Sequence, residues 1–211
     1  MTVTISTVYL LNVQSGQLEA AEMWDAIAEK QLTDWEAEWV PELFKGVQRL
    51  ARAGVERRHW PQSRHWDWRR KTAALQGMLA NPGFSVVCAR VTQGMMLVDT
   101  TMQRCRLDEQ KGKNIVYVSF VESAPWNRKE LFDPPRYRGI GTILIRAAIE
   151  LSQDEGFKGR IGLHSLPQAN AFYANTCGMT DLGADKDYQD LRYFEMTSKE
   201  AEAFIEKGGK T

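Results

Sequence analysis

The stretch from Arg136 to Gly141, which reads Arg-Tyr-Arg-Gly-Ile-Gly, constrains this chain more than any other feature. It leads into a segment, Ile140 to Leu151, whose apolar residues recur three and four positions apart, and this spacing predicts an amphipathic helix. The first backbone N–H groups of a helix have no partner within the helix, and the helix dipole adds partial positive charge there. Glycines let a ligand approach such a backbone closely. The pattern therefore predicts an anion-binding turn at the start of a helix.

Length and charge narrow the class of protein. The 211 residues suffice for one sizeable core. Lys plus Arg and Asp plus Glu number 27 each, so no net charge attracts the chain to nucleic acid or to an anionic membrane. No apolar run approaches the roughly 20 residues of a membrane span, and the N-terminus lacks a signal-peptide pattern. We expect a cytoplasmic protein with neither a membrane nor nucleic acid as its partner.

The cysteines do not suggest a crosslinked or metal-binding protein. Cys88, Cys105 and Cys177 are odd in number and lack Cys-x-x-Cys spacing, so we expect reduced thiols and no metal site.

Seven strands are expected from apolar and β-branched runs bounded by turn residues. They cover residues 3–13, 84–91, 95–104, 115–122, 160–165, 179–182 and 191–196. The segment at about 18–80 reads as mainly helical, with a capping box at Thr33-Asp34-Trp35-Glu36 and a kink at Pro41. Further helices are expected at about 140–155, 167–175 and 199–205. This order predicts one sheet with both antiparallel and parallel neighbours.

A second motif follows the glycine-rich turn at Ala171-Phe172-Tyr173. An Arg-x-x-Gly-x-Gly turn that opens a helix, followed later by such a Phe-Tyr helix, resembles the GCN5-related N-acetyltransferase (GNAT) family. The resemblance rests on about residues 84–196, and the helical segment at 18–80 is longer than the family usually has. It implies one GNAT-like domain over 1–211 with the α/β (α+β) acyl-CoA N-acyltransferase fold: a mixed, mostly antiparallel sheet of about seven strands flanked by helices.

The resemblance also implies an activity, transfer of an acetyl group from acetyl-coenzyme A to a primary amine within a ternary complex. The coenzyme diphosphate would lie against the amides of residues 137–142, and the strand at 115–122 would hold the thioester and pantetheine arm through its main chain. The residues expected to bind the coenzyme are Phe120, Val121, Glu122, Arg136, Tyr137, Arg138, Gly139, Ile140, Gly141, Thr142, Asn170 and Tyr173.

Two proton transfers need catalytic groups. By the resemblance, Tyr173 is the general acid that protonates the departing thiolate. The family counterpart is followed four residues later by a glycine and an aromatic residue, whereas here Gly178 comes one position late. A base or a water chain must take the proton of the amine, and Glu122 is the first candidate, with His164 and Asp99 as alternatives. No metal is implied.

Several readings stay open. The insertion at 123–133 either walls the acceptor pocket or is a structural loop. The basic, Trp-rich segment 57–71 packs under helices, shapes the acceptor site, or binds single-stranded nucleic acid. The alternative functions are a non-catalytic acyl-CoA-binding regulatory module and an RNA or protein interaction module. The acceptor, a small-molecule or peptide amine, is not specified, nor is the acyl group. A free sheet edge would allow a homodimer.

Overall fold

The computed structural model describes residues 3–75 and 77–208, which form two compact units. The first consists of Met1–Met78, Pro82–Met96 and Val121–Leu144, and the second of Leu79–Asn81, Leu97–Phe120 and Ile145–Thr211. The strand order of the nine-stranded sheet is β6-β1-β2-β3-β4-β5-β7-β9-β8. All seven expected strands are present, and β2 and the short β6 are additional. The description as one GNAT-like domain stays a prediction.

The N-terminal hairpin corrects one sequence prediction. β1 (Ile5–Asn12) pairs antiparallel with β2 (Leu18–Trp24), where a helix was expected to begin. The side chain of Asn12 accepts hydrogen bonds from two amides of the connecting turn, and Gly16 adopts a left-handed φ of 68°. This turn places residues 18–24 beside β1, so strand pairing outweighs the helical propensity of a Leu-Glu-Ala-Ala sequence.

The turn between the strands β3 (Gly83–Cys88) and β4 (Val91–Asp99) begins three residues earlier than expected, at residue 89 in place of residue 92. Their turn is formed by Ala89 and Arg90, both with positive φ, whereas the sequence favoured a turn that includes Gly94. Gly94 lies inside β4 for a packing reason, because a Cβ there would come 2.4 Å from Cγ2 of Ile140 at the start of α4 (Ile140–Asp154).

The helical part of the first unit begins at α1 (Glu29–Asp34), continues through a π-helical turn (Trp35–Trp39) and ends with α2 (Val40–Arg52). The prediction of a capping box at Thr33 is wrong, because the helix starts earlier. There the side-chain oxygen of Gln31 accepts a hydrogen bond from the amide of Ala28. The expected break at Pro41 takes the form of the π-helical turn directly before it.

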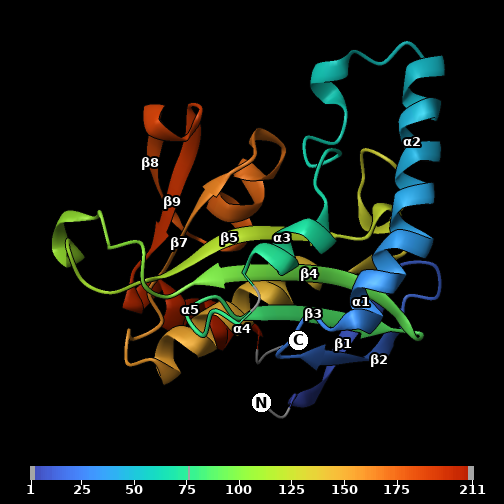
Figure 1. Cartoon of the computed structure of the whole chain (residues 1–211). Coiled ribbons are helices and arrows are strands. Elements are labelled where there is room, and N and C mark those ends of the chain that lie inside the picture. Colours follow the sequence, from blue (N-terminus) through green and yellow to red (C-terminus); the bar gives the residue numbers. More distant parts are fainter. Residues whose placement is uncertain (1–2, 76, 209–211) are drawn as a thin grey trace. The chain divides into compact units, whose positions relative to one another are not determined.

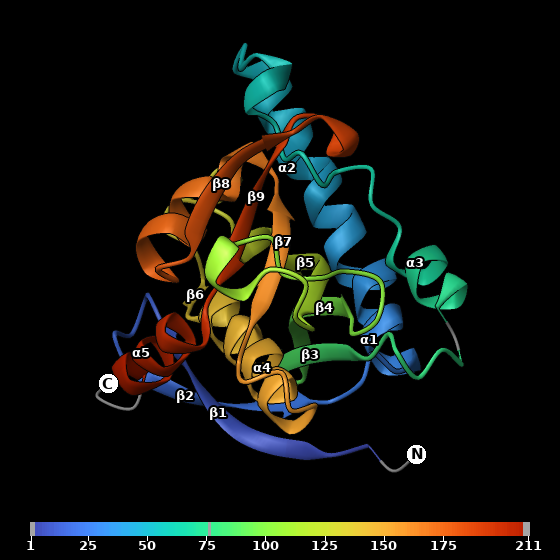
Figure 2. The ribbon, with the colours of Figure 1, turned by 90° about the vertical axis from the view of Figure 1, so that its left-hand side faces the viewer.

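After α2 the chain returns beside it, through a short 3₁₀ turn (Arg57–His59), to α3 (Trp68–Ala74), as Figures 1 and 2 show. Asp67 caps α3 by accepting a hydrogen bond from the amide of Arg70. Gly46 is the buried residue of α2, and a Cβ there would come 2.8 Å from Leu131. Most of α2 therefore has its side chains in contact with solvent.

In the second unit, the first residues of β5 (Val116–Ser123) pair parallel with β7 (Ile161–Ser165). There β7 and β8 (Thr180–Asp185) pair antiparallel with β9 (Leu191–Met196). The expected mixture of strand directions is thus confirmed. The C-terminal helix α5 (Ser198–Gly208) is also confirmed, and a Cβ at Gly159 would come 2.9 Å from its Ala201.

Candidate active site

The glycine-rich turn has the geometry of a helix start. Tyr137 and Arg138 form the short strand β6 beside β1, and Gly139 then adopts a φ of 103°, a value that favours glycine. The carbonyl of Gly139 accepts the first helical hydrogen bond, from the amide of Ile143 at 3.0 Å. The amides of residues 140–142 therefore form the first turn of α4, where no partner exists within the helix. These three donors coincide with residues predicted to bind the diphosphate.

The three residues before Gly139 in the motif lie outside the first turn of α4. The amide of Tyr137 donates to the side chain of Asn127 at 2.9 Å, and its hydroxyl donates to Glu19, so Tyr137 holds the turn in place. Arg136 and Arg138 are exposed at either side of it. Ile140, Gly141 and Thr142 are the members of the predicted set whose amides lie in the first turn of α4, and their binding of the diphosphate stays a prediction.

The insertion at 123–133 supports this turn. The side-chain oxygen of buried Gln93 accepts hydrogen bonds from Trp126 and Asn127, at 2.8 and 2.9 Å. The amide of Arg136 in turn donates to the carbonyl of Trp126, and the Arg136 guanidinium lies over the Trp126 ring. A strand residue, the insertion and the glycine-rich turn therefore form one connected network, which sequence reasoning missed because its members are distant in the chain.

The carboxylate of Glu122 accepts three hydrogen bonds inside the first unit. One oxygen accepts hydrogen bonds from Ser63 at 2.5 Å and Arg128 at 2.9 Å, and the other accepts from the Trp68 indole at 2.6 Å. Burial raises the pKa of Glu122 above its ordinary value, although the Arg128 guanidinium and the hydrogen bonds from Ser63 and Trp68 act in the opposite direction. The carboxylate thus gains proton affinity while keeping a fixed orientation.

The helix that carries Tyr173 absorbs the extra residue before Gly178. Residues Phe172–Thr176 form a π-helical turn, in which the amide of Cys177 donates to the carbonyl of Phe172. Gly178 then adopts a left-handed φ of 69°, and the amide of Met179 donates to the carbonyl of Tyr173, as in a glycine-capped helix end. A π turn is a common way to accommodate one inserted residue.

The environment of Tyr173 keeps its phenol protonated. The side chain is 5% exposed, and its ring contacts Phe172 and Phe194. Burial raises the pKa of Tyr173 well above its ordinary value. It also raises the pKa of Cys177 to about 12, so this neighbouring thiol stays neutral.

Asn170, predicted to order the pantetheine arm, carries an unsatisfied acceptor. Its side-chain oxygen is buried and receives no hydrogen bond from any residue that the structure describes. A buried acceptor without a donor is uncommon in native proteins. The predicted role of Asn170 stays a prediction.

The other two base candidates are engaged in the second unit. The ring of His164 bonds to the Tyr117 hydroxyl at 2.8 Å and to Asp185 at 2.9 Å, and it stacks on Tyr188. Burial lowers the pKa of His164, while the hydrogen bond that its ring donates to Asp185 opposes this. The carboxylate of Asp99 accepts hydrogen bonds from two backbone amides of the turn that follows β4 and from the side-chain amide of Asn81. Both groups have structural partners, as Glu122 has, and of the three only Glu122 lines the pocket formed by α2 and residues 63–66. Which of them acts as the base stays a prediction.

The main chain of Phe120 and Val121 belongs to the later part of β5. The parallel register between β5 and β7 runs from Val116↔Ile161 to Val118↔Leu163, and β5 continues to Ser123. Their predicted role in holding the thioester stays a prediction.

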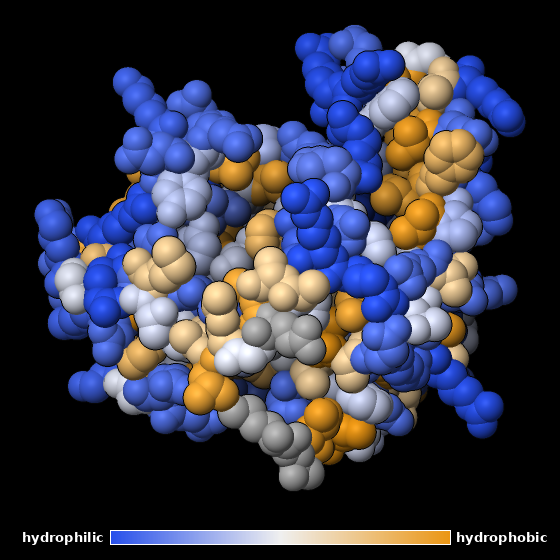
Figure 3. Space-filling model, viewed as in Figure 1, coloured by the Kyte–Doolittle hydropathy of each residue, from blue (hydrophilic) through white to orange (hydrophobic). Residues whose placement is uncertain are grey.

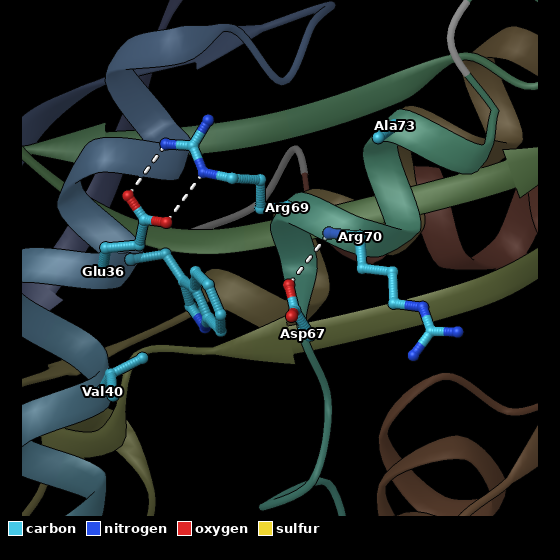
Figure 4. A pocket seen from close by; sticks show the side chains of 7 residues that line it. Glu36, Val40, Asp67, Arg69, Arg70 and Ala73 are labelled. Atoms are coloured by element: carbon cyan, nitrogen blue, oxygen red, sulfur yellow. Dashed lines mark hydrogen bonds and ion pairs between the residues drawn. The ribbon is translucent and has the colours of Figure 1, made fainter.

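The Trp-rich segment folds inward at two of its indoles. Trp68 is fully buried on Glu122, and Trp66 meets it edge to face at 6.4 Å. Among the basic residues, Arg69 is bound by Glu29 and Glu36, and Figure 4 shows its paired hydrogen bonds with Glu36. The segment thus builds the surroundings of Glu122.

The described residues include neither a cluster of metal ligands nor a helix that could cross a membrane. Within residues 3–75 and 77–208, no three His, Cys, Asp or Glu side chains are grouped as a metal ion would need. Over the same ranges, none of the helices combines the length and apolarity that a bilayer crossing requires.

Comparison with known proteins identifies the fold. No family model and no curated protein matches the sequence. Among solved structures, RimJ of Mycobacterium smegmatis in complex with CoA-disulfide is 13% identical, with 97% of this chain and 95% of that chain covered and a TM-score of 0.52. A putative arylalkylamine N-acetyltransferase 7 of the yellow fever mosquito is 12% identical, with 94% and 96% covered and a TM-score of 0.53. The resemblance to the GNAT acetyltransferases is thereby confirmed at the level of the fold.

Proposed function

Because the chain has the GNAT fold, we propose that it is an N-acetyltransferase that moves an acetyl group from acetyl-coenzyme A directly to a primary amine. The observation that carries the proposal is the bend at Gly139, which opens α4 and presents the amides of Ile140, Gly141 and Thr142 together. A helix start of this kind favours a diphosphate through its N–H groups and its dipole. Arg136 and Arg138 add positive charge beside it.

A second observation supports the proposal that coenzyme A binds to this chain. The pantetheine arm of coenzyme A contains amide N–H groups, and the buried oxygen of Asn170 lacks a donor among the described residues. We propose that this oxygen accepts a hydrogen bond from the arm, and that the main chain of Phe120, Val121 and Glu122 contributes further contacts.

The coenzyme supplies an activated acetyl group as a thioester, and residues of the chain manage the protons. In the proposed step, the amine nitrogen forms a bond to the acetyl carbonyl carbon, and the bond from that carbon to sulfur breaks. Glu122 takes the proton that the amine loses, directly or through a water molecule. Tyr173 gives its hydroxyl proton to the leaving thiolate and regains one from solvent.

The surroundings of both groups agree with these roles. A carboxylate with a raised pKa is a stronger base than an exposed one, and Glu122 has such a pKa. Tyr173 carries its proton at neutral pH, as an ordinary phenol does, although its raised pKa also makes it a weaker acid. With a pKa of about 12, Cys177 remains a neutral thiol, so it is a poor nucleophile and direct transfer is favoured over an acyl-enzyme.

Release of the coenzyme thiol tests the proposal. The purified chain is incubated with acetyl-coenzyme A and a panel of primary amines, and thiol formation is followed with a chromogenic reagent. We expect amine-dependent release for at least one class of amine. If coenzyme A binds but no amine promotes release, the chain is a coenzyme-binding module and the enzymatic assignment is wrong.

A further inference from the structure

We propose that the acceptor is a monoamine with a hydrophobic body, either aryl or branched alkyl, and that this body binds in a pocket of the first unit between α2 and residues 63–66. The reaction of the bound amine rests on the proposed function, whereas its binding can be measured independently. The pocket has a volume of about 370 Å³, within the range of small-molecule sites.

One wall of the pocket is an apolar helix face that little else covers. Leu43, Phe44 and Val47 recur three and four positions apart on α2, so they share one face. Phe44 is 64% exposed although it lies at the cavity. Figure 3 shows apolar side chains gathered along this part of the surface. An exposed apolar face beside a concave site is typical of a surface that a ligand completes.

The π-helical turn before α2 extends this wall. Trp35 and Trp39 flank the turn, and both line the pocket. The amide of Val40 donates to the carbonyl of Trp35, which is the wide hydrogen bond of a π turn. Such turns occur frequently at functional sites because they change the direction of the side chains that follow. Here the turn adds two indoles to the wall formed by Leu43, Phe44 and Val47.

The wall opposite α2, formed by residues 63–66 and Glu122, carries charges that disfavour the binding of polycations. Glu122 is the acidic side chain among the residues that line the pocket in the described part of the chain, and its charge is already matched by Arg128. Arg64 and His65, at the same pocket, add basic groups. A polyamine or an aminoglycoside would bring several positive charges and meet no further carboxylate. An amine with one charge and an apolar body matches the aromatic lining.

The test compares binding of amines by calorimetry, using 2-phenylethylamine, 3-methylbutylamine and spermidine as probes. We expect phenylethylamine to bind at least about tenfold more tightly than spermidine. Phe44→Ala should weaken phenylethylamine binding about tenfold, because it removes an aromatic contact. Tyr9→Ala is the matched control, since Tyr9 is 59% exposed on β1, outside this pocket, and should leave binding unchanged.

The outcomes separate this inference from the proposed function. If spermidine binds more tightly, or Phe44→Ala has no effect, the inference is wrong while acetyl transfer to another amine can still stand. If hydrophobic amines bind through Phe44 yet none releases coenzyme thiol, the pocket assignment holds and the enzymatic proposal fails. If these amines do not bind and sedimentation shows a dimer that Phe44→Ala dissociates, a second copy covers the face and the inference is overturned.

Discussion

The carboxylate of Glu122 and the guanidinium of Arg128 form an ion pair of 2.9 Å in the interior of the first unit, where their side chains are 7% and 12% exposed. Arg128 belongs to the inserted segment, whereas Glu122 is the last residue but one of β5, the strand that leads into it. The insertion therefore fixes the electrostatic surroundings of the candidate base, and two partners from the Trp-rich segment, Ser63 and Trp68, complete its hydrogen bonds.

Removing Arg128 should destabilise the chain. Arg128→Gln leaves the buried carboxylate without its cation, and breaking one side of a buried ion pair costs about 3–5 kcal/mol. The free energy of unfolding, measured with urea, should fall by about that amount. Lys129→Gln is the control, because Lys129 is exposed and its loss should change stability by no more than about 0.5 kcal/mol. Equal stability of the two variants would contradict the structural role of the pair.

Glu122→Gln should remove a pH dependence of acetyl transfer. Burial raises the pKa of Glu122 above 4.5, so the base becomes protonated, and kcat/KM for the amine falls, at a pH above that value. The Gln variant should lose about 100-fold to 10,000-fold in kcat/KM and lack this inflection. Glu130→Gln, which alters another partner of Arg128, should retain the inflection. An unchanged profile in Glu122→Gln would exclude Glu122 as the base.

Tyr173→Phe should lower turnover by at least about tenfold while leaving the affinity for the coenzyme unchanged, because only the donated proton is lost. Initial rates of thiol release and calorimetry with coenzyme A give the two quantities. Tyr9→Phe, which removes a hydroxyl from an exposed tyrosine, is the control. Full activity in Tyr173→Phe would assign the proton to water or to another group.

Gly139→Ala should weaken coenzyme binding. The φ of 103° at Gly139 costs an L-residue about 1–3 kcal/mol, and relief of that strain would turn the first amides of α4 away from the diphosphate. We expect at least about a tenfold loss of affinity for coenzyme A. Gly183→Ala introduces comparable strain, at a φ of 89°, in β8, and should leave the affinity intact. An equal loss in both variants would indicate a general effect of strain.

Asp185 should make part of the stability of the second unit sensitive to acid. Hydrogen bonds from Arg106 and His164 lower the pKa of Asp185 from 3.8 to about 2. A lowered pKa in the folded state stabilises the fold above pH 3.8, and this contribution is lost as the pH falls from there to about 2. Between these pH values, the melting temperature of Asp185→Asn should fall less than that of the unchanged chain. Asp190→Asn, at an exposed turn residue, should behave like the unchanged chain.

The sequence predicted those elements whose signal is local. The apolar spacing after Ile140 and the glycines before it defined α4 and its entry, and the seven expected strands are all present. The hairpin partner β2 was missed because pairing with β1 overrides its helical composition. The turn at Ala89 and Arg90 was missed because neither residue is a usual turn former.

The partners of the site residues were beyond sequence reasoning. Nothing in the sequence near Glu122 indicates that Ser63 and Trp68, more than fifty positions away, donate to its carboxylate. Gln93 likewise gives no local signal of its role under the glycine-rich turn. Such contacts depend on how distant segments pack, and only the folded structure brings them together.

A crystal structure of the chain with bound coenzyme A tests the central claim most directly. We predict that the diphosphate oxygens lie within hydrogen-bonding distance of the amides of Ile140, Gly141 and Thr142, and that the pantetheine arm donates to the side-chain oxygen of Asn170. A coenzyme whose diphosphate lies away from the start of α4 would contradict the account.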